Sequence, residues 1–300
     1  MKYNSPLVSV VITTFGRAKF LKNAINSVLC QSYKNLEIIV IDDNVEGSIE
    51  RKETENLMKN SFQKIKYIQN KKNEGACFSR NVGIQNSKGE YIAFLDDDDE
   101  FFKTKIEEQL QKFKKISVKE SKIAIISCKM GIYDELNKKL KVSKYNLIKE
   151  SNNLKDFLEG VYISGTSTLF FKKDALLKVG GFQKIESCQE AYLILRILEK
   201  GYLFSSINKE LVFYRKHNLG NIGSGEKSKK GQIKYLEEMR LVIDKNLKNS
   251  KKALLCYNYE LMNIYDCDVK YLWILIKLNP ISLITLKSIL KVIRRRIKWF

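Results

Sequence analysis

Several residue types are scarce in this chain of 300 residues, and each scarcity excludes a class of protein. There is one histidine, His217, and the six cysteines form no C-x-x-C pair, so the spacing of a zinc site is missing. Scattered cysteines of this kind are typical of free thiols in a reducing cytoplasm. With two prolines in total, the chain also has no proline-rich linker.

Long hydrophobic runs are missing as well. No stretch reaches about 18 uncharged apolar residues, so we expect no segment to span a bilayer. The first apolar run, residues 7–12, is short, lacks a strongly basic flank and leads directly into a polar loop. A secretory signal has a different pattern, and we therefore expect a cytoplasmic protein.

Basic residues, in contrast, are abundant and unevenly placed. The net charge is +20, and residues 201–300 contain 20 Lys and Arg against 8 Asp and Glu. Such an asymmetry indicates a negatively charged partner, either nucleic acid or anionic lipid. The apolar content of 44% is ordinary and sufficient for a globular core.

Apolar runs and helical periodicity alternate along the first hundred residues. The pattern predicts strands at 7–12, 36–41, 66–69 and 91–95, with helices at 18–29, 48–60 and 75–86 between them. Alternation of this kind predicts βαβ units and a mostly parallel central sheet, the arrangement of Rossmann-like nucleotide-binding folds.

The pattern after residue 100 is mixed and then becomes helical. It predicts a helix at 104–115, strands at 123–128, 163–171 and 211–214, and a helix at 191–198. Everything from about residue 228 has helical periodicity, and a group of glycines precedes that point. We therefore predict an α/β body over residues 1–222 and a basic helical extension over residues 223–300.

An acidic run, Asp96–Asp99, closes the apolar stretch 91–95. Adjacent carboxylates repel one another, so such a run is tolerated where it is solvated or where a cation neutralises it. Mg²⁺ and Mn²⁺ bind oxygen ligands and are often shared between one or two carboxylates and the phosphates of a substrate. Ligands of open α/β sheets bind at the carboxyl ends of strands, where this run is expected to lie.

Several blocks of residues, in order along the chain, resemble the family-2 glycosyltransferases, which are inverting enzymes of the GT-A fold. The resemblance covers about residues 7–220. It rests on the segments 8–17, 27–44 and 73–83, on the acidic run, and on the glycine turn 179–182.

The resemblance implies a site for a nucleotide-sugar, in particular a UDP-sugar. Asp43 matches the carboxylate that accepts a hydrogen bond from the uracil imide, and Asp97 is placed to face the ribose. Arg80 is a cation beside the acidic run that orients it or holds phosphate. The residues implied to line the base and diphosphate pocket are Thr13, Phe15 and Arg17.

The resemblance also implies a divalent metal, Mn²⁺ or Mg²⁺, and an acceptor site. Asp96 and Asp98 match the Asp-x-Asp metal motif, and His217 falls where many relatives place a histidine near the metal or diphosphate. Gly165 and Thr166 match the loop at the floor of the acceptor site.

Glu190 matches the general base, which removes the proton of the acceptor hydroxyl. The family more often has Asp at this position, followed by a bulky aromatic residue, whereas Ala191 follows here. Glu186 is the next candidate base in the same segment. Gly16 and the segment 44–46 also depart from the family's usual residues in the nucleotide loops.

The last twenty residues, 281–300, have the pattern of a basic amphipathic helix. Five basic side chains fall on one face, while leucines and isoleucines gather on the other. Such a helix with terminal aromatics is typical of an interfacial membrane anchor, and each basic residue near an anionic leaflet contributes about 1 kcal/mol. The alternative is a helix that packs on the catalytic body.

Together these features predict a metal-dependent inverting glycosyltransferase, peripheral on the cytoplasmic face of the inner membrane. Its acceptor would be a cell-surface glycan or a lipid-linked unit of lipopolysaccharide or capsule, and we expect no nucleic-acid partner. One alternative is a sugar nucleotidyltransferase, although the segment 13–19 has a single glycine where those enzymes carry a glycine-rich loop. The other is a non-catalytic basic protein that binds membrane or RNA and keeps a degenerate GT-A core.

Overall fold

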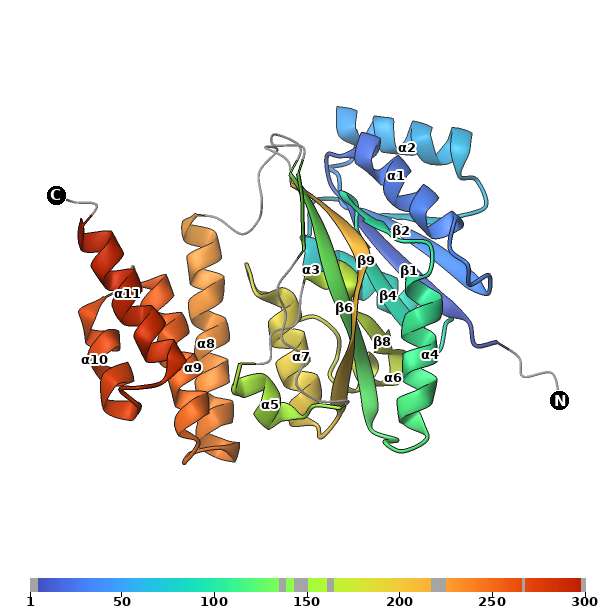
Figure 1. Ribbon diagram of the computed structural model, residues 1–300. Coiled ribbons are helices and arrows are strands. Elements are labelled where there is room, and N and C mark those ends of the chain that lie inside the picture. The colour runs from blue at the N-terminus through green and yellow to red at the C-terminus, as the bar shows by residue number, and fades with distance from the viewer. Residues whose placement is uncertain are drawn as a thin grey trace.

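The computed structural model describes residues 5–134, 139–142, 151–160, 165–216, 225–265 and 268–297. Within these residues an α/β body is followed by helices that line one side of it (Figure 1). The predicted strand at 163–171 begins in a segment, 161–164, that lies outside the described residues, and His217 lies outside them too.

A sheet of nine strands forms the centre of the body, in the order β3-β2-β1-β4-β8-β6-β9-β5 with β7 paired to β6. Strands β1, β2, β3 and β4 are parallel to one another, and so are β6 and β9. Strands β5, β7 and β8 are antiparallel to their neighbours. The bounds are β1 Val8–Thr14, β2 Leu36–Asp42, β3 Lys66–Gln69, β4 Tyr91–Asp96, β5 Asp99–Phe101, β6 Ile123–Asp134, β7 Lys139–Val142, β8 Phe170–Lys172 and β9 Leu203–Lys216.

The acidic run connects β4, which belongs to the parallel part of the sheet, to β5, which is last in the strand order. Asp96 ends β4, Asp97 and Asp98 form the turn, and Asp99 begins β5. Because two residues can span only a few ångströms, the sheet must curl until its far edge returns to the end of β4. This curl brings the acidic run beside β9, with which β5 pairs from Asp99 to Phe101.

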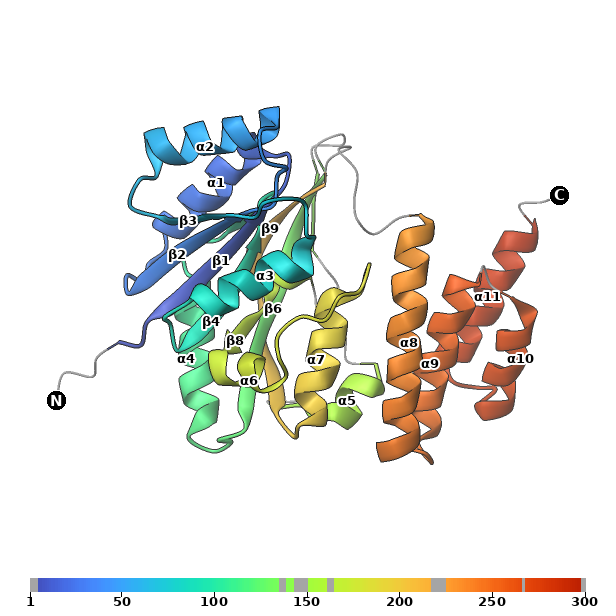
Figure 2. The same ribbon diagram turned by 180° about the vertical axis from the view of Figure 1, so that it is seen from behind.

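Two cores cover the two faces of the sheet, because side chains of a strand point alternately to opposite faces. In β1, Val8, Val10 and Ile12 belong to one core and Val11 to the other. Helices α1, α2 and α4 pack on the first face and α3, α6 and α7 on the second (Figures 1 and 2). The helices of the body are α1 Ala18–Leu29, α2 Ile49–Ser61, α3 Ala76–Asn86, α4 Lys105–Ser117, α5 Leu154–Leu158, the 3₁₀ turn η1 Thr166–Thr168, α6 Lys173–Lys178 and α7 Gln189–Glu199.

The C-terminal extension is helical, as the periodicity predicts, and two apolar clusters hold it together. One apolar cluster joins α8 and α9 to α5 and α7 of the body, and a second, smaller cluster joins α9, α10 and α11 to one another. Figure 1 shows α8 beside α7, with α10 and α11 farther from the sheet. The bounds are α8 Glu226–Asn246, α9 Lys251–Ile264, α10 Val269–Leu278 and α11 Leu283–Ile297.

The fold class expected from the sequence is confirmed, but three strands differ clearly from their predicted bounds, one of them β6, which was expected at 123–128 and extends to Asp134. Within the described residues 165–171, Thr166–Thr168 form η1 and Phe170 and Phe171 belong to β8, and the Ser167 hydroxyl bonds to the acidic run. Strand β9 begins at Leu203 and not near residue 211, since a polar stretch is drawn into pairing with β6.

Candidate active site

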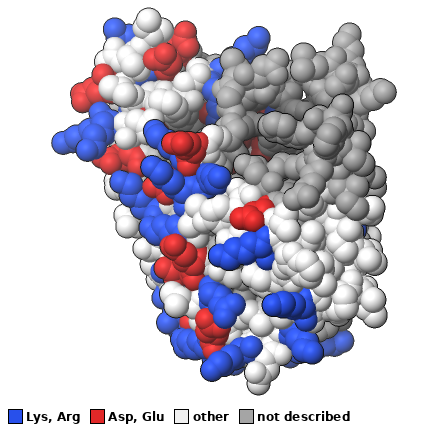
Figure 3. All heavy atoms as spheres, turned by 90° about the vertical axis from the view of Figure 1, so that its left-hand side faces the viewer, with Lys and Arg blue, Asp and Glu red and all other residues white. Residues whose placement is uncertain are grey.

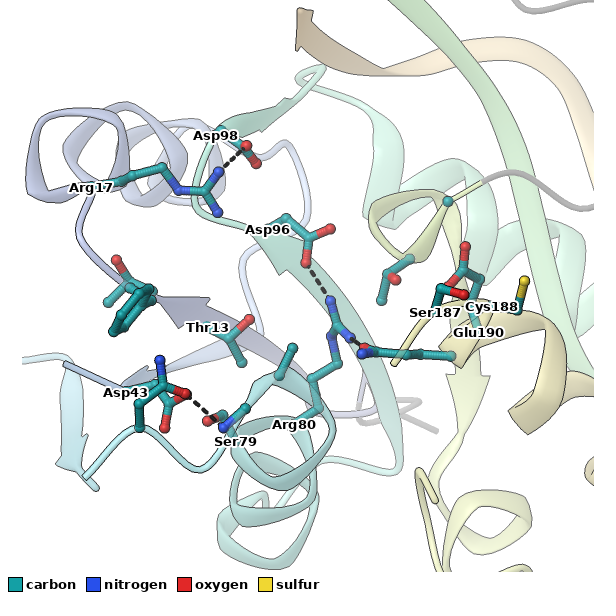
Figure 4. Close-up of a pocket in the computed structure, with 18 of the residues that line it drawn as sticks. Thr13, Arg17, Asp43, Ser79, Arg80, Asp96, Asp98, Ser187, Cys188 and Glu190 are labelled. Atoms are coloured by element: carbon teal, nitrogen blue, oxygen red, sulfur yellow. Dashed lines mark hydrogen bonds and ion pairs between the residues drawn. The ribbon is translucent and has the colours of Figure 1, made fainter. Parts of the chain in front are cut away.

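One cavity of about 650 Å³ lies at the carboxyl ends of β1, β2 and β4. Its walls come from segments that are far apart in the sequence, including α3, η1 and the first turn of α7. Figure 4 shows Arg17 and Asp43 on one side of it and Ser187, Cys188 and Glu190 on the other. Of the residues proposed from the sequence, those that line it are Thr13, Phe15, Arg17, Asp43, Arg80, Asp96, Asp98, Gly165, Thr166 and Glu190.

Asp43 lies just after β2 and holds the next loop in place. Its carboxylate accepts hydrogen bonds from Asn70 Nδ2 at 2.7 Å, from the backbone N–H of Glu74 at 3.0 Å and from that of Gly75 at 2.9 Å. The side chain is nearly buried, yet it lines the cavity. Its backbone N–H continues the β1 ladder by donating to Thr14 O at 2.9 Å, so the sheet itself places this carboxylate.

Asp97 is not where the sequence analysis placed it. Its side chain is fully buried below the cavity and does not contribute to the lining, so it does not face a ribose. It pairs with Arg17 Nη2 at 2.7 Å and accepts a hydrogen bond from Thr14 Oγ1 at 2.7 Å. Burial raises the pKa of the Asp97 carboxyl to about 7, although the Arg17 charge opposes this shift. Asp97 therefore braces the turn.

Asp96 and Asp98 are the two members of the run that open on the cavity, with 32% and 13% of their side chains exposed. Each is paired with an arginine from another segment. Asp98 binds Arg17 Nη1, while Asp96 Oδ1 accepts a hydrogen bond from Arg80 Nη2 at 2.8 Å (Figure 4). The two arginines hold the carboxylates apart and offset their mutual repulsion.

Arg80 also reaches across to the helix that carries the candidate base. Its Nη1 donates to Gln189 Oε1 at 2.6 Å, and its guanidinium lies 5.3 Å from the centre of the Phe182 ring. One buried arginine thus connects the acidic turn with the first turn of α7. Sequence reasoning did not single out Gln189, and its position directly before Glu190 was the available signal.

Asp99, to which the sequence analysis gave no role, and Ser167, which follows Thr166 in the loop matched to the acceptor site, form the support under the acidic turn. The Ser167 hydroxyl accepts from the backbone N–H of Asp96 at 3.1 Å and donates to Asp99 Oδ2 at 2.5 Å. Burial, reinforced by the charges of Asp96 and Asp98, raises the pKa of the Asp99 carboxyl well above its ordinary value.

Glu190 occupies the first turn of α7, where the helix dipole favours a carboxylate. Burial raises the pKa of the Glu190 carboxyl, and the Arg80 charge opposes part of that shift. Cys188, the residue before the helix, has φ 55°, and no other non-glycine residue in the described part of the chain has a positive φ. This left-handed conformation turns the chain sharply into α7 and aims its first turn at the cavity.

Helix α8 of the extension contacts the loop that precedes Glu190, the candidate base. Ser187 Oγ donates a hydrogen bond to Ser228 O at 2.7 Å. Gly231 comes so close that a Cβ atom there would lie 2.3 Å from the backbone nitrogen of Ser187. A glycine is therefore required at this contact. The extension is in direct contact with the segment that carries Glu190.

The described residues do not form a complete metal site by themselves. They contain no group of three or more His, Cys, Asp or Glu side chains that could hold an ion by themselves. Asp96 and Asp98 provide two carboxylates facing the cavity, and His217 lies outside the described residues.

Comparisons with known proteins agree with this geometry. The family description "Glycosyl transferase family 2" matches residues 9–177. A protein of Campylobacter jejuni, named GalNAc(5)-diNAcBac-PP-undecaprenol beta-1,3-glucosyltransferase, is 30% identical over 94% of this chain and 92% of its own length. The amylovoran biosynthesis glycosyltransferase AmsB of Erwinia amylovora is 26% identical over 76% of this chain and 74% of AmsB.

Other relatives match over a smaller part of their length. An uncharacterized glycosyltransferase of Rickettsia felis is 36% identical over 50% of this chain, and the matched segment spans 24% of that protein. Among solved structures, S. aureus TarS 1-349 in complex with UDP-GlcNAc gives a TM-score of 0.60 at 17% identity, covering 88% of this chain and 72% of that one. At this identity the likeness shows a shared fold.

Proposed function

The chain belongs to glycosyl transferase family 2, and from this premise we propose that it transfers a sugar from a UDP-sugar to a hydroxyl group of a cell-surface glycan or lipid-linked acceptor. The carrying observation is that one cavity contains Asp43, the Asp96–Asp98 pair and Glu190. The names of the relatives support this acceptor class, since one refers to an undecaprenol-linked glycan and another to amylovoran. The structural neighbours with UDP-GlcNAc and UDP support the donor class.

The donor side of the cavity suits a nucleoside diphosphate. Phe15 lines the cavity with 50% of its side chain exposed, which leaves a ring face for the uracil base. Asp43, already fixed by three hydrogen bonds, has carboxylate lone pairs to accept one more from a base edge. Arg17 and Arg80 supply positive charge beside the phosphate positions.

We propose that Glu190 is the general base. Inversion requires proton removal from the acceptor hydroxyl on the face opposite the leaving diphosphate. Figure 4 shows Glu190 across the cavity from Arg17 and Asp43, which is the arrangement that such a displacement needs. A raised pKa makes a carboxylate a stronger base once it is ionised.

We propose that Asp96 and Asp98 hold Mg²⁺ or Mn²⁺ together with the donor phosphates, with His217 as a further ligand. Two carboxylates open to one cavity fit the usual Mg²⁺ site, in which phosphate and water oxygens complete the coordination. A bound divalent ion would stabilise the negative charge that develops on the departing diphosphate. Asp97, buried against Arg17, would stay outside that coordination.

UDP release from a panel of UDP-sugars by the purified protein tests this function. We expect release from at least one UDP-sugar, loss of that release in excess EDTA and recovery with Mn²⁺ or Mg²⁺. The same preparation should form no UDP-sugar from UTP and a sugar 1-phosphate. Formation of that product would favour the nucleotidyltransferase alternative, and the absence of every reaction would favour a binding protein with a degenerate core.

We further propose that the extension binds an anionic membrane surface, as a lipopolysaccharide or capsule enzyme on the cytoplasmic face of the inner membrane would. Helix α11 packs on its neighbours through Thr285, Ser288 and Val292. This leaves Leu283, Leu286 and Leu290 exposed on one stripe, at 67%, 47% and 54%. Figure 3 shows the face that the C-terminal helices form, where basic side chains lie among uncharged and acidic ones.

An exposed stripe of leucines next to lysines suits the boundary between headgroups and acyl chains. Helix α11 packs on α9 and α10 of the extension, whereas the alternative placed it on the catalytic body, and it still presents apolar side chains outward. Within the described part of the chain, no helix is both long enough and apolar enough to cross a bilayer.

A further inference from the structure

A second cavity, of about 430 Å³, lies where the extension meets the body. Its walls come from four helices, α5 and α7 of the body and α8 and α9 of the extension. Protein interiors contain few voids larger than a water molecule, so a space of this size is a candidate binding site. The proposed function does not use it.

The first turn of α7 separates the two cavities. Gln189 and Glu190 line the first cavity, Ala191 lines the second, and Cys188 lines both. The second cavity therefore begins two residues before the candidate base. A molecule whose hydroxyl group lies at Glu190 would have to extend past Cys188 to enter it.

The lining of the second cavity combines aromatic rings with polar side chains. Phe157 and Tyr235 contribute the rings, while Gln232, Glu260 and Asn263 contribute amide and carboxylate groups. Gln232 donates only a long hydrogen bond of 3.5 Å to Ser228 Oγ, whereas Asn263 Oδ1 is held by Lys291 Nζ at 2.6 Å. The other side chains that line the cavity are apolar and include Leu158, Leu236, Met239 and Ile264. Pyranose rings present both apolar C–H faces and hydroxyl groups, so this lining offers contacts to both parts of a sugar.

Electrostatics also connect the second cavity to the base. Burial raises the pKa of the Tyr235 phenol, and the charges of Glu260 and Glu190 and the Cys188 thiol reinforce that shift. The phenol therefore lies within electrostatic range of one carboxylate from each cavity. A sugar bound beside Tyr235 would be the direct neighbour of a sugar whose hydroxyl group meets Glu190.

We propose that the second cavity binds the sugar unit of the acceptor that adjoins the reacting sugar, so that the preferred acceptor is an oligosaccharide. This inference rests on the proposed glycosyltransferase function and adds the acceptor class to it. Its specificity residues are Gln232 and Tyr235 on α8, together with Glu260 on α9.

Saturation-transfer NMR on the UDP-bound protein tests this site, with cellobiose, lactose, maltose and chitobiose as probes and their monosaccharides as references. We expect at least one disaccharide to bind about tenfold more tightly than its monosaccharide. Ala191→Met, which extends a side chain into the second cavity, should remove that preference and leave UDP affinity unchanged. Gln232→Ala should weaken the same disaccharide by several-fold.

The matched control is Glu237→Ala, an exposed position on the same helix α8, which should change neither affinity. Thermal unfolding of each variant confirms that it is folded, and Gln232→Ala carries the test if Ala191→Met does not fold. If no disaccharide exceeds its monosaccharide, or if the preference survives Ala191→Met, the second cavity is not an acceptor subsite. If UDP itself does not bind the wild-type protein, the proposed donor is wrong, which is a separate failure.

Discussion

The two sides of the catalytic cavity are built differently. On the donor side, Asp43, Asp96 and Asp98 follow parallel strands and are held by hydrogen bonds or arginines from neighbouring segments. On the acceptor side, Glu190 follows a left-handed residue and a loop that α8 of the extension holds. The sheet thus positions the proposed donor side, while the proposed acceptor side depends on contacts between segments far apart in the chain.

The largest expected effect is at the acceptor side. Glu190→Gln should lower sugar transfer by about 10²–10⁴-fold, because positioned proton transfer is lost, and should leave UDP affinity unchanged. Glu186→Gln is the matched control and should retain activity. Full turnover in the Glu190 variant would contradict Glu190 as the base and make Glu186 the next candidate.

The pH profile of the wild type sharpens the same assignment. A general base acts in its ionised form, and burial raises the pKa of Glu190. The acid limb of kcat/KM should therefore lie at higher pH than that of an exposed glutamate, with activity falling as pH decreases through that raised pKa. A limb at the pH of an exposed carboxylate would contradict a buried Glu190 as the base.

At the donor side, Asp98→Asn should lower transfer by about 10²–10³-fold, since a metal ligand contributes several kcal/mol to the stabilised transition state. Mn²⁺ affinity in the presence of UDP, measured by calorimetry, should fall with it. Asp97→Asn separates the two roles, because it should reduce the free energy of unfolding by roughly 2 kcal/mol or more and change Mn²⁺ affinity little. Equal loss of metal affinity in both variants would contradict this separation and would place Asp97 among the metal ligands.

A smaller effect is expected where the extension holds the base loop. Gly231→Ala places a Cβ atom against Ser187 and should reduce the free energy of unfolding by about 1–3 kcal/mol. Transfer should fall more than UDP affinity, because the displaced segment belongs to the acceptor side only. Lys230→Ala, one residue earlier, is the control, and urea unfolding together with UDP titration measures both quantities.

The smallest effect on catalysis is expected at α11. Leu286→Gln with Leu290→Gln should weaken binding to anionic vesicles by about tenfold or more, since each exposed leucine gains roughly 1.5–3 kcal/mol on burial. Salt should weaken the binding of the wild type because it screens surface charge. Transfer to a soluble acceptor should not change. Leu241→Gln, an exposed leucine on α8, is the control, and unchanged vesicle binding in the double variant would contradict the membrane proposal.

The sequence predicted the parallel half of the fold well, because strands buried on both faces are continuous apolar runs that helical periodicity interrupts. Strands β1, β2 and β4 lie close to their predicted bounds for this reason. Strand β5 has three residues and starts at Asp99, so no apolar pattern marks it. The bounds of β8 and β9 depend on tertiary pairing with β6, which periodicity does not encode.

The candidate site, like the fold, could be predicted from the sequence only in part. Ten proposed residues line one cavity because their motifs follow strand ends and helix starts. Within the acidic run, however, four identical side chains have different surroundings, and only the fold determines which ones are buried. Asp97 and Asp99 are buried, whereas Asp96 and Asp98 line the cavity. A sequence of four successive aspartates does not indicate which of them are buried.

The contact between Gly231 and Ser187 sets a rule for chimeras of this enzyme. A chimera joined between residues 222 and 223, where the composition changes, would combine α8 of one relative with the Ser187 loop of another. The two surfaces would then not be complementary at this close contact. Exchanging the extension between relatives should therefore give a folded, active protein only when the segment 183–191 is exchanged together with α8. Acceptor choice would then depend on two segments, about forty residues apart in the chain, that must be exchanged together, and not on a single C-terminal module.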